Sequence, residues 1–164
     1  YEADKNDIIV EFKGIKTNLT ANWDGTVDSF IWSKDGKKVY FVAPVDGTKQ
    51  LFEVNFPGLT RIAINVHQIT SGDFDVNDLV GFNGDEIIVT RNDMNHAPEI
   101  FSFNLKKNSW KQLSNVNSDT YKTIGLSKTE KRYVPTTDGK KMLVWVILPT
   151  NINVAKKYPT LLFC

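Results

Sequence analysis

The sequence predicts a mainly β fold, built from the antiparallel four-stranded blades of a partial β-propeller. Three observations carry this prediction. Short apolar runs alternate with a period of two, glycine-containing turn signals separate them, and a longer unit repeats along the chain. No window combines a 3.6-residue apolar period with helical caps, so we expect almost no helix.

Antiparallel strands are expected before the sequence pattern changes. Examples, in chain order, are residues 8–12, 29–32, 38–43, 50–56, 86–91 and 99–105. Tight hairpin turns need positive φ angles, which glycine adopts without steric cost. The expected turns are accordingly Asp35-Gly36, Asp46-Gly47, Pro57-Gly58 and Asn83-Gly84.

An internal repeat assigns these strands to blades. Val39 aligns with Ile87, an offset of 48 (87 − 39), and Leu51 aligns with Ile100, an offset of 49 (100 − 51). Each unit closes on a similar tripeptide: Asn18-Leu19-Thr20, Gln68-Ile69-Thr70 and Gln112-Leu113-Ser114. A four-stranded unit of this length is typical of propeller blades, which are stable only when stacked. We therefore expect the tail of one blade at 1–20 and two blades at 21–70 and 71–114.

The pattern changes after Ser114. Residues 115–128 are polar and irregular, which predicts a crossover or linker ending in a domain boundary near Ser127 or Lys128. Residues 132–137 and 141–148 predict a hairpin around Asp138-Gly139, and residues 158–164 predict the start of another strand. The chain lacks an initiator Met and stops inside an apolar run, so we expect it to be a fragment.

Composition narrows the possible functions. The 164 residues are 41% hydrophobic and 24% charged, with a net charge of +1, which argues against a nucleic-acid partner. A single cysteine, Cys164, excludes a disulfide scaffold and a thiolate zinc cluster. The longest apolar run, residues 142–148, is far shorter than the ~20 residues that span a bilayer, so no membrane partner is expected.

Two parts of the sequence resemble a known family. Residues 32–41, with the closing tripeptide Gln68-Ile69-Thr70, resemble the propeller repeat of the prolyl oligopeptidase family of serine peptidases. Residues 134–142, 145–149 and 156–164 resemble the first strands of that family's α/β-hydrolase domain, most of all in its bacterial dipeptidyl-peptidase and acylaminoacyl-peptidase branch.

The resemblance implies a serine exopeptidase that acts on peptide substrates, without a cofactor, in the periplasm or outside the cell. In this family the propeller gates the catalytic chamber and admits short or unfolded peptides. The glycine-rich oxyanion loop and the nucleophile lie beyond the matching residues. The implied role of this chain is therefore gating, substrate filtering and interdomain packing, and the chain alone is expected to be inactive.

No catalytic, cofactor-binding or metal-binding residue is assigned. The stretch Gly125-Leu126-Ser127-Lys128-Thr129 lacks the second glycine of a nucleophile elbow, so Ser127 is interpreted as a linker hydroxyl. The two histidines, His67 and His96, are 29 residues apart (96 − 67) in different repeat units. His67 is expected in an outer strand or turn and His96 in a loop, and neither is expected to bind a metal.

Three further patterns are interpreted as structural. In the calcium-loop-like stretch that begins at Asp73, the sixth position is Asp78 and the twelfth is Gly84, where Gly and Glu are required, so we expect a connection between blades. The glycosylation pattern that begins at Asn18 coincides with a closing tripeptide and carries no weight. Aromatic residues that could stack on a sugar or base are expected instead to pack between blades: Trp23, Trp32, Phe52, Phe101, Trp110 and Trp145.

Two alternatives to the peptidase interpretation remain open. The chain could be a non-catalytic propeller that binds protein or glycan, in which case residues 134–164 should form another blade. It could also be a small β-sandwich adhesin, against which the repeat argues. As part of a propeller, it would expose unpaired strand edges, so we expect it to self-associate.

Overall fold

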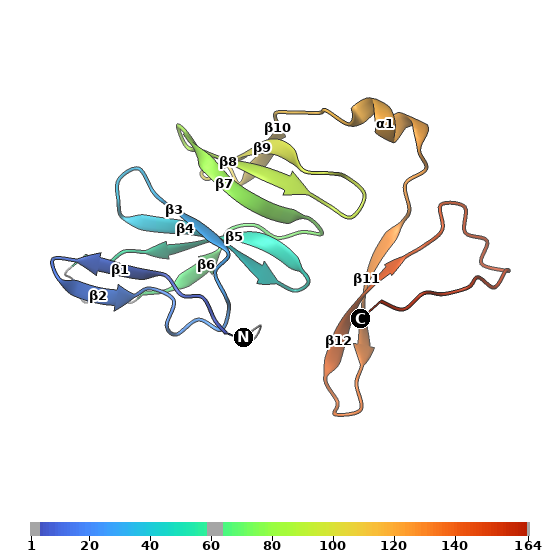
Figure 1. The fold of residues 1–164 in the computed structure, drawn as a ribbon, viewed down its shortest axis with the longest axis horizontal. Coiled ribbons are helices and arrows are strands. Elements are labelled where there is room, and N and C mark those ends of the chain that lie inside the picture. The colour runs from blue at the N-terminus through green and yellow to red at the C-terminus, as the bar shows by residue number, and fades with distance from the viewer. Residues whose placement is uncertain (1–3, 59–63, 164) are drawn as a thin grey trace. The chain divides into compact units, whose positions relative to one another are not determined.

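The computed structural model describes residues 4–58 and 64–163 of the chain. The chain divides into two compact units, Tyr1–Asn117 and Ser118–Cys164 (Figure 1). No helix in the described residues is long and apolar enough to cross a membrane.

The first unit consists of antiparallel sheets in which each strand pairs with the next one along the chain. The preceding sheet pairs β1 (Ile9–Phe12) with β2 (Ile15–Asn18). The middle sheet contains β3 (Ser29–Trp32), β4 (Lys38–Val45), β5 (Thr48–Asn55) and β6 (Val66–Gln68). The last sheet contains β7 (Asp75–Asn83), β8 (Glu86–Asn92), β9 (Glu99–Asn104) and β10 (Ser109–Gln112). The predicted mainly β fold of antiparallel blades is confirmed.

Two-residue turns join the central strands of these sheets. Asp46 and Gly47 have φ angles of 54° and 73° between the paired residues Val45 and Thr48, the two positive values that a type I′ turn requires. In the last sheet the pairing of Asn83 with Glu86 places Gly84, with φ of 62°, first in the turn. The expected Asn83-Gly84 turn is therefore Gly84-Asp85, one residue later. The Pro57-Gly58 turn leads into residues outside the described part of the chain.

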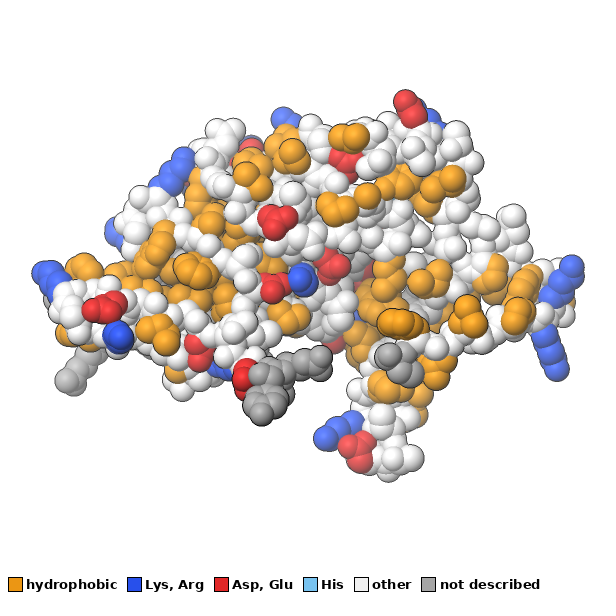
Figure 2. Space-filling view, in the orientation of Figure 1, with side chains coloured by type: hydrophobic (Ala, Val, Ile, Leu, Met, Phe, Trp, Pro, Cys, Tyr) orange, Lys and Arg blue, Asp and Glu red, His pale blue; other side chains and the backbone are white. Residues whose placement is uncertain are grey.

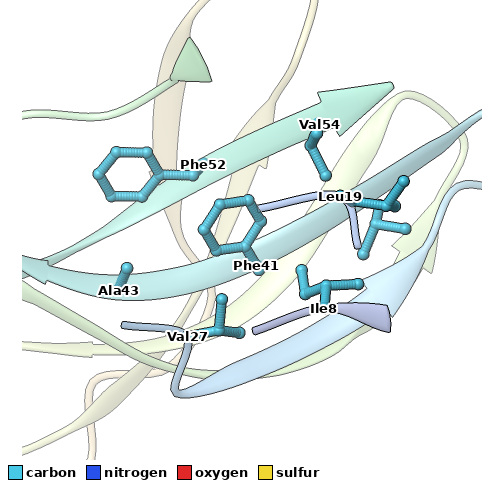
Figure 3. Packing of buried hydrophobic residues seen from close by; sticks show 8 residues of the cluster. Ile8, Leu19, Val27, Phe41, Ala43, Phe52 and Val54 are labelled. Atoms are coloured by element: carbon cyan, nitrogen blue, oxygen red, sulfur yellow. The ribbon is translucent and has the colours of Figure 1, made fainter. Parts of the chain in front are cut away.

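The middle sheet is buried on both faces. Val39, Phe41 and Ala43 of β4 point into a first core against the preceding sheet, and Tyr40 and Val42 point into a second core against the last sheet. In Figure 3 the ring of Phe41 lies among the labelled residues of the first core. The members of the first core are Ile8, Leu19, Val27, Val39, Phe41, Ala43, Phe52 and Val54. Those of the second core are Tyr40, Val42, Leu51, Val76, Ile87, Val89 and Phe103.

This burial explains why β4 reads as a continuous apolar run. Successive side chains of a strand point to opposite faces, so a sheet covered on both sides needs apolar residues at consecutive positions. The sheets thus stack face to face, as the repeat requires, and strands β4 and β8 are the equivalents that the offset of 48 predicted.

The second unit is a helix followed by a hairpin. Helix α1 (Ser118–Thr123) has no buried residue and carries an ion pair of 2.7 Å between Lys122 Nζ and Asp119 Oδ1. Strands β11 (Thr129–Pro135) and β12 (Lys141–Ile147) pair antiparallel around Asp138-Gly139, as predicted.

Three expectations about the positions of helices and strands are wrong. Residues 118–123 are helical rather than irregular, since a polar six-residue helix has no apolar stripe to reveal it. Strand β7 begins at Asp75, inside the stretch interpreted as a connection. Residues 158–163 form no strand, because a strand needs a hydrogen-bonded neighbour and no described segment pairs with them.

Candidate functional site

The closing tripeptides are a repeated hydrogen-bond network, which we call the closing network. In the middle sheet Thr70 Oγ1 donates to Gln50 Oε1 at 2.8 Å and accepts a hydrogen bond from the backbone N–H of Leu51 at 2.9 Å. All these atoms are buried. One hydroxyl therefore satisfies a side-chain acceptor and a backbone donor together, which secures the end of the sheet.

The same geometry recurs at the end of the preceding sheet. Thr20 Oγ1 donates to Asp7 Oδ1 at 2.7 Å and accepts from the N–H of Ile8 at 3.1 Å. The amide of Asn18 accepts from the Thr20 N–H at 2.9 Å and donates to Asp7 Oδ2 at 2.9 Å. Asn18 is therefore committed to the fold, in agreement with the structural interpretation of the glycosylation pattern.

The last sheet closes in the same way. The hydroxyl of Ser114 donates to a carboxylate oxygen of Glu99 and accepts from the N–H of Ile100 at 2.8 Å. The other oxygen of Glu99 accepts from the N–H groups of Val116 and Asn117 at 2.8 and 3.2 Å. Asp7, Gln50 and Glu99 are thus equivalent acceptors, although their side chains differ in length and charge.

These hydrogen bonds shift the acidity of the two carboxylic acids. The hydroxyl of Thr20, followed by the amide of Asn18, lowers the pKa of Asp7 to about 2. The hydroxyl of Ser114 is also the main cause that lowers the pKa of Glu99. Both carboxylates are therefore ionised at neutral pH and act as acceptors, not as acids.

One face of the last sheet carries apolar side chains that the described residues leave largely exposed, whereas both faces of the middle sheet are covered. This outer face contains Val80, Ile100 and Leu113, which are 64%, 44% and 48% exposed. The repeat makes Ile100 and Leu113 equivalent to Leu51 and Ile69 of the middle sheet, which pack in or against the second core. The outer face is therefore built like a surface that another sheet covers.

The residues considered for catalysis or metal binding lie in different elements of the chain. Ser127 stands between α1 and β11, so its segment runs from helix to strand, the reverse of the order in a nucleophile elbow. His67 lies in β6 and His96 in the loop between β8 and β9, where its Nδ1 is 2.8 Å from Asp93 Oδ1. Within residues 4–58 and 64–163, no three His, Cys, Asp or Glu side chains cluster as metal ligands.

The stretch that superficially matches a calcium loop has its carboxylates committed elsewhere. Asp75 Oδ1 accepts from the backbone N–H of Lys49 at 2.7 Å, and Asp78 Oδ2 accepts from the hydroxyl of Thr90 at 2.8 Å. These acceptors connect β7 to the middle sheet and to β8. The stretch joins two sheets, as expected, although β7 takes up nine of its twelve residues.

Most of the aromatic candidates pack within the sheets. The Trp23 ring lies 5.3 Å from the rings of both Phe41 and Phe52, and Trp110 lies 4.7 Å from Phe103. Trp32 is the exception, because it is 39% exposed and contacts Phe56 at one edge of the middle sheet. The expectation of a packed Trp32 is therefore wrong. Trp145, on β12, faces the ammonium of Lys131 at 5.5 Å.

Charged residues form no large patch of one sign on the face shown in Figure 2, where both signs are scattered among apolar side chains. Lys38 forms an ion pair of 2.8 Å with Glu53, and Lys106 forms one of 2.9 Å with Asp85. The sequence did not single out Arg91, whose guanidinium lies among aromatic rings. The available signal was a charged side chain near the end of a strand whose centre, residues 87–89, is apolar.

The stacked four-stranded antiparallel sheets with a repeated closing network are those of a β-propeller. The chain belongs to the family described as the dipeptidyl peptidase IV (DPP IV) N-terminal region, whose model matches residues 4–143. The resemblance to prolyl oligopeptidase-family peptidases found in the sequence is thereby confirmed.

Similar proteins include two dipeptidyl-peptidases 5. The one from Porphyromonas endodontalis is 36% identical over 128 residues, 77% of this chain and 17% of that protein. The one from Porphyromonas gingivalis is 29% identical over 166 residues, 100% of this chain and 23% of that protein. The chain thus spans about a fifth of the length of these relatives.

Solved structures share the fold at low sequence identity. Acylaminoacyl peptidase from Pyrococcus horikoshii superimposes with a TM-score of 0.70 at 18% identity, over 90% of this chain and 21% of that chain. The AtxE2 isopeptidase without ligand gives a TM-score of 0.67 at 12% identity, over 93% of this chain and 23% of that chain.

Proposed function

We propose that this chain is the non-catalytic propeller portion, with the first hairpin of the hydrolase domain, of a serine-type dipeptidyl peptidase. The observation that carries the proposal is the family match over residues 4–143 together with relatives named as dipeptidyl-peptidases. The described residues are consistent with it, since Ser127 lies outside a nucleophile elbow and the carboxylates of the closing network are ionised acceptors.

In this proposal the sheets form part of the wall that surrounds the catalytic chamber of the complete peptidase. A stack of blades held by buried hydroxyl networks is rigid, and a rigid wall around a catalytic chamber admits peptides by size. The chain contributes substrate filtering and packing against the hydrolase domain, while the nucleophilic serine and its partners are supplied by other residues.

A hydrolysis assay tests this division of labour. The chain would be incubated with dipeptides linked to aminomethylcoumarin and, separately, labelled with a fluorophosphonate probe, with dipeptidyl-peptidase 5 of P. gingivalis as positive control. We expect the control to release the fluorophore and the chain neither to release it nor to take up the probe. Hydrolysis or labelling by the chain itself would overturn the proposal.

We also propose that the isolated chain self-associates through its outer face. The equivalent face of the middle sheet buries Leu51 completely beneath the last sheet, whereas Ile100 and Leu113 remain about half exposed. A second copy offers Ile9, which is 62% exposed and lies on the face of its preceding sheet opposite to Val10 and the first core. Burying such apolar surface is favourable by roughly 25 cal/mol per Å².

A further inference from the structure

Arg91 of β8 lies in a setting unlike that of the other described cations. Its guanidinium carbon is 3.8 Å from the ring centre of Phe74, 4.9 Å from that of Phe101 and 5.0 Å from that of Trp110. We call these three rings the aromatic cradle. Trp110 stands nearly perpendicular to Phe74 and Phe101, at 85° and 90°, so the rings form walls rather than one flat surface.

The guanidinium has no hydrogen bond or ion pair with any residue in 4–58 or 64–163. Burial lowers the pKa of Arg91 from its ordinary value, and the negative charge of Asp93 partly opposes this shift. Arginine nevertheless stays ionised at neutral pH. Asp93 itself is engaged by His96, whose Nδ1 lies 2.8 and 2.9 Å from its two oxygens. The result is a half-buried cation whose hydrogen-bond donors have no acceptor among the described residues.

The architecture of the blade does not require this cation. The repeat offset of 48 makes Arg91 equivalent to Ala43 (91 − 43), which is fully buried in the first core. There the packing is completed by Trp23, which contacts Phe41 and Phe52. An apolar residue therefore suffices at this position of the repeat, and the charge at Arg91 calls for another explanation.

We propose that Arg91, held by the aromatic cradle, is a binding site for a peptide carboxylate. Contact with the Phe74 ring, 3.8 Å from its centre, holds the guanidinium in place, and two parallel N–H donors of a guanidinium match the two oxygens of a carboxylate. Asp93 favours this singly charged group over a phosphate, since its repulsion grows with the charge of the ligand. The choice of a peptide as the source rests on the proposed function.

The test observes the arginine Nε–H signals of the ¹⁵N-labelled chain, which has only Arg61, Arg91 and Arg132. Three blocked peptides are titrated: acetyl-Ala-Glu-Ala-amide, acetyl-Ala-Ala-Ala with a free C-terminal carboxylate, and acetyl-Ala-Gln-Ala-amide as the neutral control. We expect the Arg91 signal to move saturably with at least one carboxylate peptide and not with the neutral one. The two carboxylate arms tell a side-chain ligand from a chain terminus.

Variants then assign the binding. Arg91→Met should abolish it, and Arg91→Lys, which keeps the charge but loses the paired donors, should weaken it by about tenfold. Arg132→Met is the control, because Arg132 forms an ion pair with Glu130 in the second unit and should leave binding unchanged. The peptide comparison on the unmodified chain needs no variant to fold.

Equal shifts with the glutamine peptide, a shift that grows without saturating, or unchanged binding in Arg91→Met would each overturn the inference. None of these results bears on hydrolysis. Peptidase activity of the chain itself would refute the proposed function while leaving carboxylate binding at Arg91 intact, so the two failures are distinguishable.

Discussion

Replacing Thr70 by Val is the sharpest perturbation of the closing network. Valine has the shape of threonine, so it leaves no cavity beside this buried residue, which is 4% exposed. It removes the hydrogen bonds of 2.8 Å to Gln50 and 2.9 Å from Leu51, and so leaves one acceptor and one backbone donor buried without partners. Each orphaned group costs about 1–3 kcal/mol, so the free energy of unfolding should fall by about 2–6 kcal/mol.

Urea denaturation followed by far-ultraviolet circular dichroism measures this loss. Two matched variants accompany it. Thr70→Ser retains the hydroxyl, as Ser114 does in the last sheet, and should lose much less stability. Thr17→Val makes the same exchange on β2, at a hydroxyl without a hydrogen bond in the described residues, and should change stability by less than about 0.5 kcal/mol. If Thr70→Val matched Thr17→Val, the network would not stabilise the sheets.

Three further predictions follow from the same structure. Phe41→Ala, at a fully buried ring, should cost about 3–5 kcal/mol in urea denaturation, and Trp32→Ala, at a ring that is 39% exposed, clearly less; equal losses would contradict the described core. Because the folded pKa of Asp7 is about 2 and its ordinary value 3.8, the unfolded chain binds the proton first, so stability is present above about pH 4 and is lost as the pH falls towards 2. Asp7→Asn, which offers an amide oxygen as Gln50 does, should flatten this part of the stability profile, and an unchanged profile would refute the assigned cause. Gly47→Ala forces a side chain into φ of 73° and should cost about 1–2 kcal/mol by thermal unfolding, whereas no loss would mean that the turn relaxes.

Much of the fold was predictable because it rests on local rules. The Asp46-Gly47 turn follows from the φ angles that a two-residue hairpin demands, and β4 follows from its unbroken apolar run. Strand β7 was not predictable in the same way. Its first residues are polar, and they are strand because distant groups, Lys49 and Thr90, bind the side chains of Asp75 and Asp78.

The candidate site shows the same limit. The closing tripeptides were visible as a repeated pattern, but the acceptors that complete them, Asp7, Gln50 and Glu99, differ in chemistry and precede the hydroxyls by 13 to 20 residues. A repeat is visible in a sequence when equivalent positions carry similar residues. The three acceptors of the closing network share only an oxygen atom in the same place, so they do not stand out as a repeat. The site at Arg91 was not predictable from the sequence, because its aromatic partners come from three separate segments.

The central claim is that each sheet is stable when another sheet covers its apolar face, and that the outer face of the last sheet remains uncovered in this chain. Sedimentation velocity of the chain across a wide concentration range tests this claim most directly. The wild-type chain should sediment as larger species as concentration rises, and Ile100→Asp, which places a charge on the outer face, should remain a monomer. Met94→Asp changes a residue of similar exposure in the loop between β8 and β9 and should behave as the wild type. A wild-type chain that stays monomeric throughout, or associates equally well with Asp at position 100, would contradict the role given to the outer face.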